Sequence, residues 1–102
     1  MLVWSVNISK KTEKNITNLP EIIQSLAFVF IRKIEMFGPY LERWDEAERL
    51  KYKNYGKLKG SDSKYHCHLK KGKPTYVVCW EINKSEITVE VYYVGTHEKA
   101  PY

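Results

Sequence analysis

The sequence predicts an α+β domain in which an N-terminal strand is followed by two helices and then by a three-stranded antiparallel meander. Two patterns lead to this fold class. Apolar residues alternate with polar ones over much of residues 65–94, as in strands, and recur at helical spacing over residues 19–37. A chain of 102 residues supplies one modest core. Because no repeat or linker interrupts the sequence, we expect a single domain over residues 1–102.

The first expected element is a strand at the start of the chain. Over residues 2–8, the apolar Leu2, Trp4, Val6 and Ile8 occupy every second position, which indicates one apolar face. Residues 9–15 are polar and are interpreted as a connector. The strand is expected to add to an edge of the sheet or to pair within it.

A long helix is predicted next. Asn18 precedes Glu21 by three residues, which is the spacing of a capping box, and Pro20 suits a first helical turn. Apolar residues then continue at helical spacing until Gly38 and Pro39, which are expected to end the helix.

A second helix is predicted over residues 40–51, before the meander begins. Its apolar positions are separated by Glu and Arg, which would face solvent. Residues 53–64 are rich in Gly, Lys, Ser and Asn and predict a surface loop. The apolar positions of this helix are Tyr40, Leu41, Trp44, Ala47 and Leu50.

The last third of the chain carries the three strands of the meander. In residues 65–69, apolar residues alternate with His66 and His68, so the two imidazoles should share one face of a short strand. Residues 75–82 are β-branched or aromatic almost throughout, which favours a central strand. Residues 87–94 alternate like a half-buried strand. The strand ends before His97, which is expected at the rim of the sheet.

The positive charge of the chain belongs to one segment. The formal net charge is +5, and residues 51–76 contain eight lysines against the single acid Asp62. Tyrosines interleave with these lysines, and a basic surface with stackable aromatic rings is typical of RNA binding. The alternative is a solvated lysine-rich loop. The interleaved tyrosines are Tyr52, Tyr55, Tyr65 and Tyr76.

The composition also favours a cytoplasmic protein without a membrane partner. The first residues lack the basic and long apolar regions of a signal peptide. The longest apolar stretch, residues 26–31, is far shorter than the ~20 residues that span a bilayer. In that compartment Cys67 and Cys79 are expected to be reduced core residues.

Three features of the sequence resemble the RelE/ParE superfamily of toxins from type II toxin-antitoxin modules. They are the motif Lys57-Leu58-Lys59-Gly60, the aromatic strand Tyr76–Ile82, and the ending Val91–Tyr102 with Gly95-Thr96-His97 inside it. The Gly-Thr-His triplet is similar to that of the RelE, YafQ and HigB branch. The likeness covers essentially the whole chain by element order, which implies a RelE-like βααβββ fold.

The resemblance implies a ribosome-dependent mRNA endoribonuclease, or mRNA interferase, that inhibits translation. The substrate's own 2′-hydroxyl would attack the adjacent phosphate, so no metal or other cofactor is expected. The implied partners are a cognate antitoxin and mRNA on the ribosome. The family's C-terminal histidine corresponds to His97, its meander histidine to His68, and a terminal aromatic residue to Tyr102. Its basic RNA-binding surface falls on Lys57, Lys59, Lys70, Lys71 and Lys73.

One departure from the family concerns arginine. Many RelE-like toxins place an arginine on the meander to stabilise the charge that develops on phosphate. Here Arg32, Arg43 and Arg49 all precede the meander, and Tyr76 is followed by Val77. The positive charge would therefore come from Lys71, Lys73 or a protonated histidine.

Attack by a 2′-hydroxyl needs a base, an acid for the leaving 5′-oxygen and cationic groups near the phosphate. His97 and His68 are the candidates for the two proton transfers, with the roles left open, because an imidazole titrates near working pH. His66 shares the strand face of His68. Glu81 is a further candidate for a base or for orienting a histidine; the alternative is an ordinary cross-strand partner of a lysine. Tyr102 is either a stacking or catalytic aromatic residue or a frayed terminus.

Three other interpretations remain at the level of the sequence. His66 and His68, with Cys67, Cys79 and His97 in reach, permit a metal site, but His-x-His gives two ligands only and no Cys-x-x-Cys is present, so none is predicted. A ParE-like toxin that binds DNA gyrase fits the missing arginine, whereas the histidines favour the nuclease. A non-catalytic RNA-binding domain would need only the lysines and tyrosines.

Overall fold

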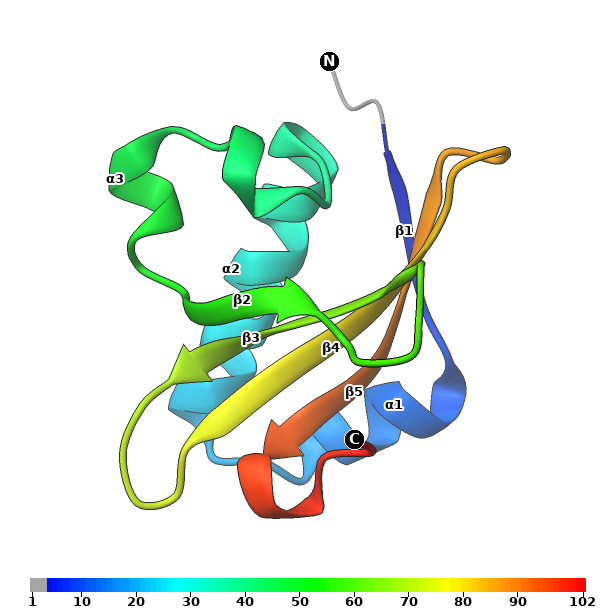
Figure 1. Cartoon of the computed structure of the whole chain (residues 1–102). Coiled ribbons are helices and arrows are strands. Elements are labelled where there is room, and N and C mark those ends of the chain that lie inside the picture. Colours follow the sequence, from blue (N-terminus) through cyan, green and yellow to red (C-terminus); the bar gives the residue numbers. More distant parts are fainter. Residues whose placement is uncertain (1–3) are drawn as a thin grey trace.

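The computed structural model describes residues 4–102, in which five strands form one mixed sheet covered by helices on one face (Figure 1). The strand order is β1-β5-β4-β3-β2, with β1 parallel to β5 and all other neighbours antiparallel. The start of the predicted first strand, residues 2 and 3, lies outside the described residues. In chain order the strands are β1 (Ser5–Ile8), β2 (Lys53–Lys57), β3 (Lys64–Lys70), β4 (Tyr76–Asn83) and β5 (Thr88–Thr96).

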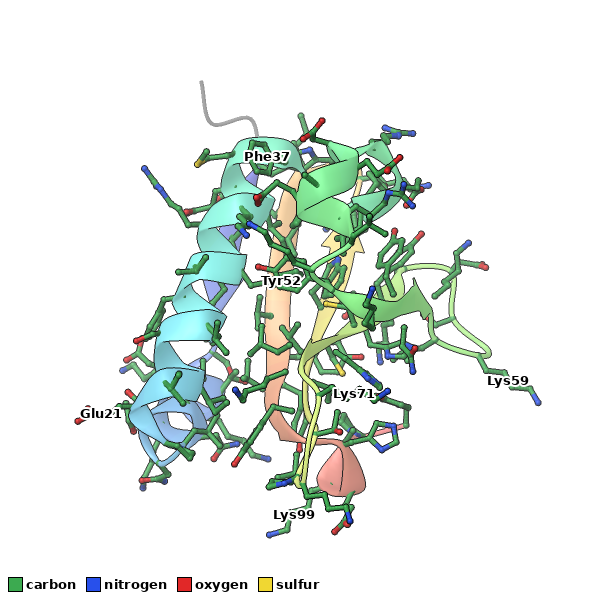
Figure 2. All side chains as sticks on the ribbon, turned by 90° about the vertical axis from the view of Figure 1, so that its left-hand side faces the viewer. Glu21, Phe37, Tyr52, Lys59, Lys71 and Lys99 are labelled. Carbon is green, nitrogen blue, oxygen red and sulfur yellow. The ribbon has the colours of Figure 1, made fainter. Side chains whose placement is uncertain are left out.

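The two longer helices lie on the same side of the sheet. Figure 2 shows the sheet nearly edge-on, with α2 on one side and the segment that carries Lys99 on the other. Within residues 4–102 no helix has the length and apolar character needed to cross a membrane. The helical elements are α1 (Lys10–Thr17), α2 (Glu21–Phe37), the 3-10 turn η1 (Leu41–Arg43), α3 (Glu46–Arg49) and the 3-10 turn η2 (His97–Lys99).

The core lies between α2 and the face of the sheet that it covers, here called the helix-covered face. Ile23, Phe30 and Ile34 of α2 are almost completely buried there. Trp80 is fully buried, and its Nε1 donates a hydrogen bond to the carbonyl of Pro39 at 3.3 Å. The opposite surface, here called the open face, carries no long helix (Figure 1). The sheet contributes to the core Tyr65, Cys67, Leu69, Val78, Trp80, Ile82, Val89, Val91 and Val94.

The predicted α+β class is confirmed, but the three-stranded meander is wrong in its strand number. Residues 53–57, expected in a surface loop, form the edge strand β2. The cause is Tyr55, whose ring stacks on Tyr65 at 5.9 Å and on Trp80 at 6.1 Å between centroids, so that the backbone of β2 is held against β3. The central position predicted for residues 75–82 is confirmed, because β4 is the middle strand of the sheet.

The prediction that the polar residues 9–15 form a connector is wrong, because most of this segment lies in α1. Ser9 caps this helix by accepting a hydrogen bond from the Thr12 amide at 3.2 Å, and Ile16 anchors it with a fully buried side chain. Asn18 ends α1 and does not cap α2, which begins after Pro20 without a side-chain cap. Thr12 is buried as well, and its hydroxyl donates to the Tyr92 carbonyl at 3.1 Å, so two buried side chains one turn apart dock this short polar helix.

The second predicted helix, residues 40–51, is interrupted. It consists of η1 and α3, separated at Trp44, whose backbone is extended with ψ 159°. The indole Nε1 of Trp44 donates to the carbonyl of Gly38 at 2.8 Å, and this buried bond holds the chain against the end of α2. The predicted end of α2 at Gly38 is confirmed, and its φ of 91° explains the glycine.

Candidate active site

The two meander histidines share the open face of β3. His66 lies opposite Cys79 and His68 lies opposite Val77 on β4, whereas the residues that alternate with them belong to the core. Both histidine side chains are half-buried. The alternation in the sequence therefore placed both imidazoles on the correct common face.

The C-terminal segment brings two more candidate residues to this face. After β5, η2 turns the chain back, and the His97 amide donates to the carbonyl of Thr75 at 2.8 Å. The centroid of the His97 ring lies 5.5 Å from that of His68 and 6.0 Å from that of Tyr102. The Tyr102 ring lies 4.8 Å from His66. We call these four residues, His66, His68, His97 and Tyr102, the His/Tyr cluster.

The floor of the cluster is apolar. Val77 and Cys79 are completely buried although they lie outside the helix-covered core, on the same face as the histidines. Burial raises the pKa of the Cys79 thiol to about 12, so this sulfur is not a thiolate nucleophile at neutral pH. Chemistry at the cluster is therefore left to imidazole and phenol groups.

The environment keeps two imidazoles neutral. Burial lowers the pKa of His66, and the nearby His68 and His97 lower it further. Burial likewise lowers the pKa of His68, followed by the charges of His97 and Lys71. Because a depressed pKa leaves the ring nitrogen unprotonated at neutral pH, both groups are suited to accept a proton. Burial also raises the pKa of Tyr102, so its hydroxyl remains a donor.

Asn54 is a contact of the cluster that the sequence interpretation missed. It lies at an irregularity of the β2–β3 pairing and has a left-handed φ of 57°. Its Nδ2 lies 3.3 Å from Nε2 of His68, so the amide can donate to that nitrogen. A β-bulge commonly re-aims a side chain beside a functional site. The signal in the sequence was Asn54 itself, since Asn tolerates left-handed backbone more readily than most residues do.

Glu81 is not part of the cluster. It pairs across the sheet with Lys64 and Glu90, and its Oε2 accepts a hydrogen bond from the Ser63 hydroxyl at 3.1 Å. It lines a different hollow, together with Asn83 at the far end of β4. The register of β4 thus favours the structural role, beside a lysine, over the catalytic one.

The candidate RNA-binding lysines are all exposed but lie in two groups. Lys70, Lys71 and Lys73 are at the end of β3 and in the β3–β4 loop, on the side where His97 contacts Thr75. Lys57 ends β2 and Lys59 follows it; Figure 2 shows Lys59 projecting at a loop tip, away from Lys71. The first group is therefore the one beside the His/Tyr cluster.

The tyrosines expected to stack on bases are used in the core. Tyr52 packs on Phe30 with 4.8 Å between ring centroids, and Tyr55 and Tyr65 stack on each other. Tyr76 packs against the helix-covered core and is thus on the face opposite the histidines. Tyr102, half-exposed at 50%, is the aromatic residue that the cluster offers to a ligand.

Residues 4–102 contain no group of three or more His, Cys, Asp or Glu side chains placed to hold a metal ion. Cys67 and Cys79 are both free. They cannot face each other across β3 and β4, because Cys67 lies opposite Val78 and belongs to the helix-covered core.

Comparison with known proteins identifies the class of fold. No family model and no curated protein matches the sequence. Solved structures do match. The archaeal RelE-RelB complex from Pyrococcus horikoshii contains a chain with TM-score 0.67 and 20% identity, covering 97% of this chain and 100% of that one. A mutant of E. coli toxin RelE in the free state has TM-score 0.68 and 16% identity, over 98% and 88%.

A third structure, a metal-bound toxin from Helicobacter pylori, has TM-score 0.64 and 23% identity, covering 97% of this chain and 98% of that one. The fold of the chain is therefore that of RelE toxins over nearly its full length. The resemblance inferred from the sequence is confirmed at the level of the fold.

Proposed function

We propose that this chain is the toxin of a type II toxin-antitoxin module and acts as a ribosome-dependent mRNA endoribonuclease. The observation that carries the proposal is the His/Tyr cluster: one strand and the C-terminal segment bring three imidazoles and a phenol together beside lysines. The RelE-like fold supports the same class. A fold alone does not define an activity, so the proposal depends on the chemistry of this cluster.

The chemistry needs only groups of the chain and of the substrate. A neutral imidazole removes the proton of the RNA 2′-hydroxyl, and the oxygen attacks the adjacent phosphorus. The P–O5′ bond then breaks, and a protonated imidazole gives its proton to the leaving oxygen, which leaves a 2′,3′-cyclic phosphate and a 5′-hydroxyl. His68, whose pKa burial lowers, suits the base role. His97, 5.5 Å away between ring centroids, then takes the acid role.

The phosphate charge is met by lysines rather than by arginine. Lys71 is close enough to His68 for its charge to affect that pKa, and Lys73 follows in the same loop. An ammonium group is a point charge without the bidentate geometry of a guanidinium. We therefore expect slower cleavage than an arginine on the meander would give.

The proposed partners are an antitoxin and mRNA on the ribosome, in the cytoplasm. Two of the matching structures are described as complexes of RelE with RelB, which supports a cognate antitoxin for this chain. The exposed lysines and the net charge of +5 support an acidic or nucleic-acid partner.

The test is to induce the chain in cells and to map mRNA 5′ ends during growth arrest, beside the variants His97→Ala and Glu81→Gln. His97 is exposed, so its loss should leave the fold intact. We expect ribosome-dependent cuts in the wild type and in Glu81→Gln, and at least a hundredfold fewer in His97→Ala. Arrest without new 5′ ends would instead support a ParE-like action on gyrase, which the absence of arginine from the meander also fits. RNA binding without arrest would support a non-catalytic domain.

A further inference from the structure

A hollow of about 530 Å³ lies beside His97, between the β3–β4 loop and η2. Its size is within the range of small-molecule binding sites. It adjoins the His/Tyr cluster because His97 belongs to both. The hollow is lined by Gly72, Lys73, Pro74, Thr75, His97 and Glu98.

Hydrogen bonds fix the walls of this hollow. The Thr75 hydroxyl donates to the Gly72 carbonyl at 2.9 Å and accepts from the Gly72 amide at 3.2 Å, which closes the loop on itself. The bond from the His97 amide to the Thr75 carbonyl then ties η2 to the loop. The hollow is therefore formed before any ligand arrives, which reduces the entropic cost of binding.

The hollow presents opposite charges that remain available to a ligand. Lys73 and Glu98 both line it and are both exposed, and within residues 4–102 neither forms an ion pair. Pro74, which also lines the hollow, adds an apolar surface. A cation, an apolar surface and a carboxylate match the phosphate, the flat base and the amino-bearing base edge of a nucleotide.

Glu98 restricts which base can be accepted. An ionised carboxylate only accepts hydrogen bonds, so it needs donors on the base. Guanine offers two adjacent donors, its N1–H and its 2-amino group, which match the two oxygens of one carboxylate. Uracil offers a single N3–H between two carbonyl acceptors, which would face the carboxylate unfavourably.

We propose that this hollow is a nucleobase subsite next to the cleavage site, in which Glu98 selects guanine and Lys73 holds a neighbouring phosphate. The inference rests on the proposed ribonuclease function and adds its base preference. It makes Glu98 a specificity-determining residue. His97 lines the hollow and also belongs to the His/Tyr cluster, so it would lie against the ribose between the base and the phosphate.

Equilibrium binding of mononucleotides tests the subsite without requiring cleavage. Guanosine 3′-monophosphate and uridine 3′-monophosphate would be titrated into the wild type, Glu98→Gln and the matched control Glu90→Gln, with binding followed by NMR. Glu90 is an exposed glutamate of β5 that lines the other hollow. We expect the guanine nucleotide to bind about tenfold more tightly, as one bidentate base contact provides. Glu98→Gln should lose most of that preference, and Glu90→Gln should keep it.

A second variant separates the phosphate from the base. Lys73→Gln should weaken both nucleotides by a similar factor and leave their ratio unchanged, because both carry the same phosphate. Equal affinity for the two nucleotides, no binding of either, or a preference that survives Glu98→Gln would overturn the subsite. Those results would leave the proposed nuclease untouched if His97→Ala still abolished ribosome-dependent cuts. Conversely, a guanine preference measured by mononucleotide binding would remain valid even if no ribosome-dependent cuts were observed.

Discussion

At the residue scale, the contact between Asn54 and His68 determines which form of the imidazole is favoured. An amide N–H can donate to Nε2 only when this nitrogen is unprotonated, so the contact of 3.3 Å stabilises the neutral ring with its proton on Nδ1. Burial and the charges of His97 and Lys71 act in the same direction on the pKa of His68. The strained backbone at Asn54 is thus coupled to the protonation of a candidate base.

The variant Asn54→Gly removes this amide without straining the chain, because glycine accepts the φ of 57° at that position. We expect the pKa of His68 to rise and the Nε2-protonated tautomer to become more populated, both measured by a side-chain ¹⁵N NMR titration. Asn54→Ala is the comparison in which backbone strain is added to the same loss. An unchanged pKa and tautomer in Asn54→Gly would show that the amide does not act on the ring.

The two depressed histidine pKa values also predict how stability depends on pH. Because the pKa values of folded His66 and His68 lie below the unfolded value of about 6.5, the unfolded chain binds more protons as pH falls through that value. Their contribution to the free energy of unfolding is therefore complete above about pH 7 and is lost on acidification. Glu48 acts in a lower window, because hydrogen bonds from Lys33 and Lys51 lower its pKa from 4.5 to about 2.

For the wild type, the urea concentration at the unfolding midpoint should fall as the pH is lowered from about 7.5 to about 5.5. The double variant His66→Gln/His68→Gln should show a flatter profile over the same range, because it lacks both imidazoles whose pKa values burial lowers. If the double variant followed the wild-type profile, neither histidine would be buried in the neutral form as the structure indicates.

At the scale of elements, the Gly-Thr-His ending of β5 is explained by packing. A Cβ added at Gly95 would lie 2.6 Å from the hydroxyl oxygen of Tyr93 and 2.9 Å from its Cζ. The Tyr93 ring thus lies over Gly95, and its hydroxyl donates to the Thr96 carbonyl at 2.7 Å. The glycine provides room for a bond that fixes the turn into His97.

Gly95→Ala should therefore displace the Tyr93 ring and loosen the turn, with a loss of about 1–2 kcal/mol in the free energy of unfolding. Cleavage should decrease by more than this stability loss explains, because His97 is the next residue but one. Tyr93→Phe is the matched control, since it keeps the ring and removes only the hydrogen bond. Denaturant melts together with the His97 ring resonances measure both effects; unshifted resonances in Gly95→Ala would contradict the packing explanation.

The periodicity of side chains within one element predicted several elements, although residues 40–51, which are also apolar at helical spacing, form η1 and α3 instead of one helix. The alternation around His66 and His68 and the apolar run of β4 therefore gave the correct faces and the correct central strand. The prediction failed where contacts with distant parts of the chain determine the secondary structure. β2 depends on the stacking of Tyr55, and α1 depends on the burial of Thr12 and Ile16, and these side chains contact segments that are distant in the sequence.

The candidate site was predictable to the same degree. His68, His97 and Tyr102 were assigned to the site from the family resemblance, and the structure places the His97 ring near both His68 and Tyr102. Glu81 was assigned to the site only on the condition of a favourable register, and the register pairs it with Lys64 instead. Pairing register and the direction of a bulge, as at Asn54, are set by the assembled sheet and are not readable from neighbouring residues.

At the scale of the whole molecule, the helices and the charges separate by face. The helices cover one side of the sheet (Figure 2), while His66 and His68 lie on the other side, opposite Cys79 and Val77, and the β3–β4 loop with its lysines is bonded to His97 through Thr75. A phosphate backbone that follows this loop would reach His97 directly, since the loop is tied to it through Thr75. RNA affinity should therefore depend on where the positive charge is placed and not on the net charge of +5 alone.

Replacing Lys70, Lys71 and Lys73 together by Gln should weaken the binding of a short single-stranded RNA. The magnitude of the slope of log affinity against log salt should decrease by about 2, because each phosphate contact on a single strand contributes about 0.7. The matched control replaces Lys10, Lys11 and Lys14 of α1, three exposed lysines, and changes the net charge by the same amount. Affinity measured by fluorescence anisotropy over a salt series distinguishes the two. Equal losses in both variants would mean that the chain attracts RNA by overall charge, whereas a loss confined to the β3–β4 loop locates the RNA path beside the histidines.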